Sequence, residues 1–185
     1  MLSTFPHAAG GERLLPFRRN QIRDAAELAY RLVVEQARRP EFFTRFGVPD
    51  TLDGRFELIC LHAFLYLRRL KSDSSAASVA QRFYDAMFAD FDRSLRELGT
   101  GDLSVGRQIK RMAEAFNGRI RAYEQGLDGE EDAVAAALDR NLYGTAPASG
   151  DQLAAMARYL RREAAGLADQ PAASLLAGAV AFGAP

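Results

Sequence analysis

The chain has 185 residues, of which 48% are hydrophobic, so it can form one domain with a buried core and is too apolar to be disordered. Its 24 cationic and 24 acidic side chains cancel, and the net charge therefore gives no argument for a nucleic-acid partner. Its single cysteine, Cys60, excludes an internal disulfide bond and fits a reducing compartment.

The N-terminal segment, residues 1–19, contains Gly10, Gly11 and Pro16 and is predicted to be loosely structured. It lacks the charged start and the apolar run of a secretion signal, so we expect a cytoplasmic protein. Residues 20–185 are predicted to form a single helical domain, because apolar residues recur there at the period of a helix.

The first predicted helix begins at Asn20, as an N-cap, and ends before Pro40. The second runs to about Lys71 after a turn. Three residues are able to cap its start: Asp50, Thr51 and Asp53.

This second helix carries an apolar run from Phe56 to Leu67 that only Glu57 and His62 interrupt. The run has about 12 residues, whereas a bilayer core requires about 20, so we predict no transmembrane segment. Its apolar positions point all round the helix, which is typical of a helix surrounded by others. We therefore predict that it is the centre of the domain.

The third helix follows a polar stretch at residues 72–75 and ends at Gly99. The fourth begins at Asp102 or Ser104 and has the most regular apolar stripe of the chain, at spacings of three and four residues. The stripe consists of Val105, Ile109, Met112, Phe116, Ile120, Tyr123 and Leu127. Both helices are expected to bury one face.

A fifth helix opens with Asp128 and Glu131, a pair that fits a capping box, and stops at Gly144. A sixth opens with a similar pair, Ser149 and Gln152.

A short helix stopped by Gly178 then precedes an extended end. The predicted fold is therefore all-α, a compact bundle of six to seven helices around a central hydrophobic helix.

The sequence shows no catalytic or metal-binding constellation. Cys60 and His62 stand two residues apart on a helix, so they diverge by about 200° and cannot share a metal. No Glu-x-x-His pair supports a di-iron site. His62 is the one histidine that a nucleophile triad could use, and we favour the alternative of a core histidine with a satisfied hydrogen bond. We predict no enzyme activity, cofactor or metal.

Surface cations are the first candidate site. Four of them project opposite the apolar stripe of the fourth helix, and we call them the basic strip: Arg107, Lys110, Arg111 and Arg121. Two interpretations stay open, namely a solvated polar face and an electropositive surface for an acidic partner, RNA or lipid headgroups. Arg68 and Arg69, at the end of the central helix, are further candidates for docking.

Charged residues near the end of the third helix form a second set: Asp90, Asp92, Arg93, Arg96 and Glu97. Two interpretations are an exposed contact site and a structural ion network that fixes how two helices meet. We favour the network. Arg119 lies beside the apolar stripe and is predicted to join this network, because a half-buried guanidinium needs a carboxylate. Asp90, Asp92 and Glu97 are the candidate partners.

Three segments carry a resemblance to a known family: GVPDTLDGRFELICLHAFLYLRRLK, FYDAMFADFDRSLRELGTGDLSVGRQIKRMAEAFNGRIRAYEQGL and AAALDRNLYG. They resemble the ubiquinol–cytochrome c chaperone family, bacterial relatives of the mitochondrial assembly factor for cytochrome b. The resemblance covers about residues 33–144, and DRSLRELGTGDLSVG is its most specific part. Asn117 departs from the pattern, because family members tend to have an aromatic residue there.

The resemblance implies a non-enzymatic chaperone for assembly of the cytochrome bc1 complex, which binds newly made cytochrome b. It also implies a place at the cytoplasmic face of the inner membrane or at the ribosome. Such a chaperone needs an apolar groove, for which we consider five aromatic residues: Phe42, Phe43, Phe46, Tyr84 and Phe88. Each of them is also a good core residue.

Two other classes stay open. An all-α ligand-sensing or regulatory module unrelated to respiration would have a similar size. A DNA-binding regulator requires a basic helix-turn-helix, which residues 20–40 do not supply, so no sequence-specific nucleic acid is expected. A small helical enzyme with a carboxylate-bound metal is the other class, and stoichiometric iron or manganese would identify it.

Overall fold

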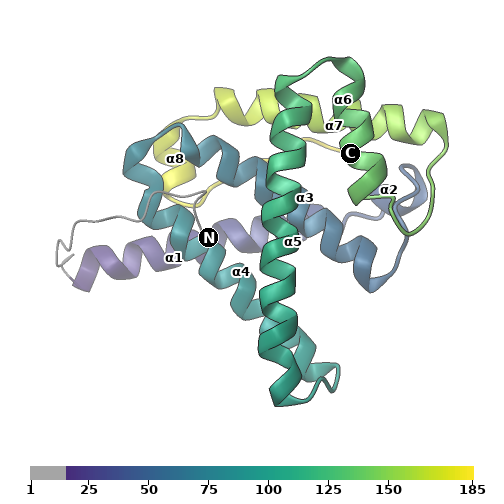
Figure 1. Cartoon of the computed structure of the whole chain (residues 1–185). Coiled ribbons are helices and arrows are strands. Elements are labelled where there is room, and N and C mark those ends of the chain that lie inside the picture. The colour runs from purple at the N-terminus through teal and green to yellow at the C-terminus, as the bar shows by residue number, and fades with distance from the viewer. Residues whose placement is uncertain (1–15) are drawn as a thin grey trace.

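A computed structural model describes residues 16–185, and all regular structure in this part of the chain is helical (Figure 1). The α-helices are α1 (Pro16–Ala37), α2 (Glu41–Thr44), α3 (Leu52–Lys71), α4 (Ala77–Glu97), α5 (Asp102–Asp128), α6 (Glu131–Asn141), α7 (Gly150–Asp169) and α8 (Ala172–Leu176). A 3-10 turn, Ser74–Ala76, precedes α4. The prediction of an all-α bundle is confirmed, and the two elements that were not predicted are the short helix α2 and the 3-10 turn.

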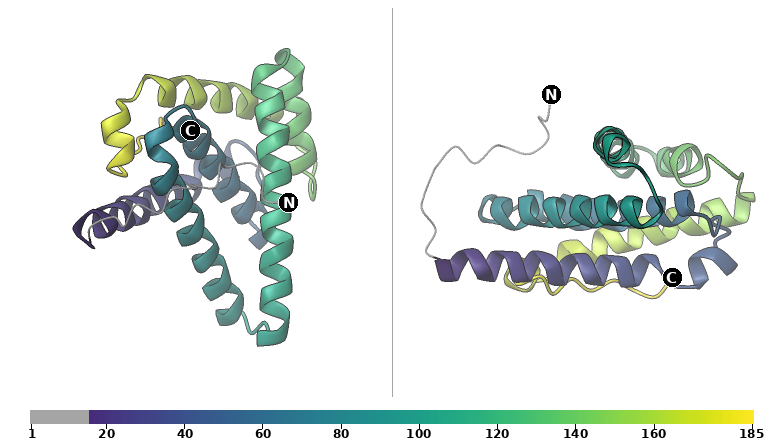
Figure 2. Two further views of the ribbon diagram at one scale, coloured as in Figure 1. Left: turned by 60° about the vertical axis from the view of Figure 1, so that its left-hand side comes forward. Right: turned by 90° about the horizontal axis from the view of Figure 1, so that it is seen from below.

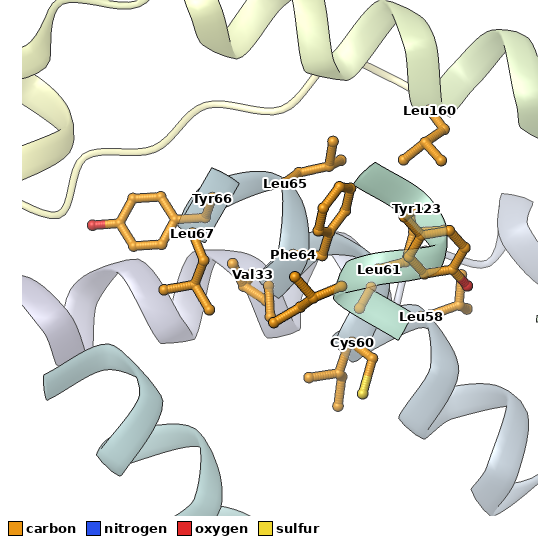
Figure 3. Close-up of a cluster of buried hydrophobic side chains, with 14 of the residues drawn as sticks. Val33, Leu58, Cys60, Leu61, Phe64, Leu65, Tyr66, Leu67, Tyr123 and Leu160 are labelled. Carbon is orange, nitrogen blue, oxygen red and sulfur yellow. The ribbon is translucent and has the colours of Figure 1, made fainter. Parts of the chain in front are cut away.

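The apolar helix α3 lies at the centre of the fold, as predicted. Every residue from Glu57 to Leu67 is buried, and α1, α4, α5, α7 and α8 all contact this helix. Figure 3 shows its side chains packed against residues of other helices, among them Val33, Tyr123 and Leu160. Burying one large apolar side chain contributes about 1.5–3 kcal/mol, so this helix supplies much of the stability.

Local side chains set the ends of several helices. The Thr51 hydroxyl accepts a hydrogen bond from the Gly54 backbone N–H at 3.1 Å and caps α3. Ser149 and Gln152 form the predicted capping box of α7. Gly99 follows α4 with φ +84°, a conformation that favours glycine.

Two predicted helix starts are wrong. Asn20 lies inside α1, which already includes Pro16, a residue suited to a first helical turn. The predicted loose segment is therefore corrected for residues 16–19, and residues 1–15 lie outside the described part. Asp128 is the last residue of α5, and α6 follows Glu130 without a side-chain cap, because α5 continues to pack through Leu127.

The helices form a body from which one hairpin protrudes. α4 and α5 meet at the loop 98–101, and this end lies away from the other helices (Figure 1). The opposite end of α5 packs on α6, and α6 packs on α7. After α8 the chain is extended and returns along α1 and α7, where residues of these helices bond to its backbone (Figure 2, right).

Candidate functional site

The protruding half of α5 carries three members of the basic strip. Arg107, Lys110 and Arg111 follow one another at helical spacing and are exposed. With Ser104 and Glu114 they line an open hollow of about 430 Å³. Within residues 16–185 none of the three cations has an ion pair, so their charge is directed to solvent. This face is available to an anionic partner.

Arg121 continues the same row. It lies fourteen residues after Arg107, close to four helical turns, and is therefore on the same face at a distance of about 21 Å along the axis. Its side chain is exposed and, in the described structure, unpaired. The basic strip is thus one straight row on a single helix.

Arg68 and Arg69 have intramolecular partners instead. Arg68 donates to a carboxylate oxygen of Asp128 at 3.1 Å, which joins α3 to the end of α5. Arg69 donates to the backbone oxygens of Leu167 at 3.0 Å and Gln170 at 3.1 Å, which closes the end of α7. Since these bonds hold helices together, we leave both arginines out of the docking surface.

The aromatic candidates are mostly core residues. Phe42, Phe46 and Phe88 are 0%, 3% and 9% exposed, so they cannot contact a partner in this conformation. The alternative of a core position therefore holds for these three. Phe43 and Tyr84 are half-buried at the edge of the core and remain candidates for an apolar contact.

The predicted charge network spans the turn between α4 and α5. Arg96 donates to a carboxylate oxygen of Asp92 at 2.7 Å, four residues earlier on α4. It also bonds to Asp102, the first residue of α5. One guanidinium therefore links the two helices, as the structural interpretation requires.

The other members of the set are arranged differently. Asp90 accepts a hydrogen bond from the Tyr30 hydroxyl at 2.8 Å and another from Arg93 at 3.2 Å. It thereby ties α4 to α1. Glu97 is exposed and has no ion pair with any described residue.

Arg119 is paired, but not with the predicted residues. Its guanidinium forms a two-pronged bond with the Glu57 carboxylate of α3. It also lies over the Phe56 ring, 5.5 Å from the centroid. Burial raises the pKa of Glu57, and the bond to Arg119 partly offsets that rise. The prediction of a structural ion pair is correct, and the predicted partners Asp90, Asp92 and Glu97 are wrong.

His62 is a buried core histidine with both ring nitrogens engaged. Nδ1 donates to the Leu58 carbonyl at 2.7 Å, because a carbonyl can only accept. Nε2 then accepts from the Tyr159 hydroxyl at 2.8 Å, and the Tyr159 oxygen accepts from the Gln36 amide at 2.8 Å. Neutral His62 fits this arrangement, and burial lowers its pKa from 6.5 to about 4.

We therefore predict that acid destabilises the protein through His62. The unfolded chain takes up a proton near pH 6.5, whereas the folded chain resists it until about pH 4. The free energy of unfolding should then fall by about 2 kcal/mol between pH 7 and pH 5. Urea unfolding at several pH values measures this loss. A His62→Gln variant should lose clearly less over the same interval, and an equal loss would contradict the assignment.

Three buried or half-buried polar residues near the C-terminal segment were missed. Gln36 and Glu163 are 7% and 4% exposed, and Gln170 is half-buried. All three bond to the backbone of residues 181–183. A signal existed, since Glu163 stands at an apolar position of its helix, three residues after Leu160 and four before Leu167.

Residues 16–185 lack two further kinds of feature. No three His, Cys, Asp or Glu side chains gather closely enough there to hold a metal ion. A bilayer-spanning helix is also absent from this part of the chain, because no helix combines sufficient length with sufficient apolar character.

The chain is similar to known proteins over most of its length. The family model described as "Ubiquinol-cytochrome C chaperone" matches residues 44–182. A crystal structure of the Cbp3 homolog from Brucella abortus superposes with a TM-score of 0.80 and 35% sequence identity, covering 91% of this chain and 94% of that one.

Curated relatives are similar over most of the chain. The ubiquinol-cytochrome-c reductase complex assembly factor 1 of Xenopus laevis is 27% identical over 80% of this chain and 75% of its own length. The proteins of that name from Drosophila melanogaster and Homo sapiens are 26% and 25% identical. The chain spans 62% and 50% of their lengths.

Proposed function

The chain belongs to the ubiquinol–cytochrome c chaperone family, and we propose that it is an assembly factor for the cytochrome bc1 complex that binds cytochrome b before assembly. The observation that carries this proposal is the family match over residues 44–182. The names of the relatives, which are assembly factors of ubiquinol–cytochrome c reductase, support it. In this role the protein acts by binding and carries out no reaction.

The basic strip is the docking surface in this proposal. An unassembled membrane protein has to be met where it enters the bilayer, and the cytoplasmic leaflet of a membrane is negatively charged. Arg107, Lys110, Arg111 and Arg121 present four unpaired charges on α5, the first three on its protruding half. Each contributes about 1 kcal/mol near an anionic surface. The protein is then peripheral to the cytoplasmic face of the inner membrane.

We predict that reversing three of these charges impairs assembly without unfolding the protein. The variant is Arg107→Glu with Lys110→Glu and Arg111→Glu, and it should weaken docking by about 100-fold, since about 3 kcal/mol is lost. Produced in a strain without its own copy, it should leave cytochrome b near the level of the deletion strain. The haem b absorbance of isolated membranes measures that level.

A control variant carries the same change of charge elsewhere: Arg18→Glu, Arg31→Glu and Arg158→Glu, on α1 and α7. It should support normal cytochrome b. Normal cytochrome b with the α5 variant would refute the docking role of the basic strip and leave the assembly role intact. Normal cytochrome b in the deletion strain itself would refute the assembly role. Co-sedimentation of the wild-type chain with ribosomes, but not with membranes, would move the docking site to the ribosome.

A further inference from the structure

The extended segment after α8 is held by side chains that form hydrogen bonds with its backbone. Gln170, the C-cap of α7, bonds to Ala181 in both directions: its amide N–H donates to the Ala181 oxygen at 2.6 Å, and its amide oxygen accepts from the Ala181 N–H at 3.0 Å. Both backbone groups of one residue are therefore bound by a single amide side chain. Such a clamp recognises any extended chain, because it contacts no side chain.

A second clamp lies two residues further on. The Gly183 N–H donates to Glu163 at 2.7 Å, and the Gly183 oxygen accepts from the Gln36 amide at 2.8 Å. The two-residue interval from Ala181 is the period of an extended strand. Between the clamps, the Phe182 ring lies edge-on to His62, with 5.2 Å between the ring centroids. We call the surface formed by Gln36, His62, Tyr159, Glu163 and Gln170 the tail groove.

The tail groove favours a small residue such as glycine after the aromatic residue. A Cβ on Gly183 would come within 2.8 Å of a carboxylate oxygen of Glu163. A larger residue at this position would therefore require the Glu163 carboxylate, which holds the strand, to shift. The chemistry that fits the tail groove is an extended segment with an aromatic residue followed by glycine.

The occupying segment is held mainly through its backbone, since the Ala184 and Pro185 oxygens also accept hydrogen bonds, from Arg162 and Arg45. Ala181, Gly183 and Ala184 are exposed, and of residues 179–185 Val180 alone among the hydrophobic side chains is buried. Gln36 and Glu163 are nearly fully buried, and each has a side-chain partner as well, Tyr159 for Gln36 and Arg162 for Glu163. The strand satisfies a remaining polar group of each, and an unsatisfied buried polar group costs about 1–3 kcal/mol. The groove is thus built to keep a strand, while the strand itself can leave without unfolding a helix.

We propose that the tail groove binds an extended polypeptide segment of a partner protein, and that residues 181–185 occupy it as an exchangeable substitute. The partner segment has an aromatic side chain beside His62 and glycine at the second clamp. This inference rests on the proposed function only for the natural ligand, which would be an unfolded segment of the chaperoned protein. The tail groove lies on α1, α3 and α7, apart from the basic strip on α5.

A tethered segment competes with any added peptide at an effective concentration in the millimolar range. A substitution that weakens binding of the tethered segment leaves the tail groove empty in a larger fraction of the molecules. The apparent affinity for an added peptide rises with that fraction. A tail that is an inseparable part of the core would give no such gain, because its displacement would disrupt the groove and leave no site for a peptide. The sign of the effect therefore separates the two possibilities.

The test uses the full chain and a labelled peptide with the sequence AVAFGAP, which copies residues 179–185. Fluorescence anisotropy should show weak binding to the wild type and at least tenfold tighter binding to Phe182→Ala. Gly183→Ala, which disturbs the Glu163 carboxylate of the second clamp while keeping the aromatic ring, should act in the same direction. Adding Gln170→Ala to either variant should abolish the gain, and a peptide with alanine in place of phenylalanine should not bind.

Circular dichroism and thermal unfolding establish that the variants are folded. Folded Phe182→Ala and Gly183→Ala chains that bind the peptide no better than the wild type would overturn the proposal. A dimer that exchanges these segments, detected by light scattering and lost in Phe182→Ala, would assign the groove to a second copy and would also overturn it. Because this assay contains no membrane and no cytochrome b, its failure leaves the proposed assembly function untouched.

Discussion

Replacing Arg119 with alanine is expected to lower the free energy of unfolding by about 3–5 kcal/mol, because it leaves a buried carboxylate without its cation. The Glu57 side chain is 8% exposed and that of Arg119 is 18% exposed, so water cannot replace the lost partner well. The total stability of a domain of this size is about 5–15 kcal/mol. The variant should therefore be marginal at 37 °C.

Urea unfolding followed by circular dichroism measures this loss. Arg121→Ala is the matched control, since it removes the same side chain from an exposed, unpaired position two residues later on α5, and it should change stability by less than about 0.5 kcal/mol. Replacing Glu57 and Arg119 together with methionine should recover most of the loss, because no buried charge then remains. Equal effects of the two arginine variants would show that the pair does not stabilise the fold.

The pH dependence of Arg119→Ala gives a second check. Without the guanidinium, burial keeps the pKa of Glu57 above its value in the unfolded chain, so the folded state binds the extra proton. The difference in the free energy of unfolding between the wild type and Arg119→Ala should consequently shrink as the pH falls from 7 to 5. His62 is common to both proteins, and its opposite effect cancels in the difference.

The helices and the central position of α3 could be predicted because they depend on local periodicity. The apolar run from Phe56 to Leu67 has no polar face, and only a helix covered on all sides can bury it. The pairing of Asp92 with Arg96 was predictable for the same reason, since four residues on a helix bring two side chains together. Such signals need no knowledge of how the helices pack.

Tertiary pairs were harder to predict. Arg119 was correctly expected to seek a carboxylate, but Glu57 is 62 residues away and belongs to a different helix. The nearer carboxylates of α4 looked suitable because sequence proximity was the only guide. Glu57 itself stood out as a charge within an apolar run. Pairing such isolated buried charges of opposite sign would have predicted the Glu57–Arg119 ion pair.

The tail groove shows a different reason why a site could not be predicted from the sequence. Gln36 and Glu163 occupy apolar positions of α1 and α7, so a functional or structural partner could be suspected for each. The partner that they share is the backbone of Gly183, and backbone groups leave no mark in the sequence. The predicted contact role of the aromatic residues was ambiguous for another reason, because large apolar residues near a turn suit a core as well as a surface. Phe42 and Phe46 are buried by packing against Tyr159 of α7, which is distant in sequence.

A Leu61→Ala substitution should destabilise the protein by about 3–4 kcal/mol, the range of leucine truncations that leave a cavity in a packed core. Leu61 is fully buried on α3, in the middle of the cluster that Figure 3 shows. Residues around it come from several helices, so the gap cannot close by moving one of them. The urea midpoint should fall while the slope of the transition stays the same, since a similar surface is exposed on unfolding.

Leu52 provides the control on the same helix. It is 67% exposed at the first turn of α3, and the identical substitution there should change stability by less than about 0.5 kcal/mol. The two variants share the change in side chain and in helix propensity, so their difference isolates burial. If Leu61→Ala costs no more than Leu52→Ala, the apolar run of α3 is not enclosed in the folded chain. Its side chains would then be free to bind a partner directly, and the proposed division between a closed core and binding surfaces on α5 and in the tail groove would fail.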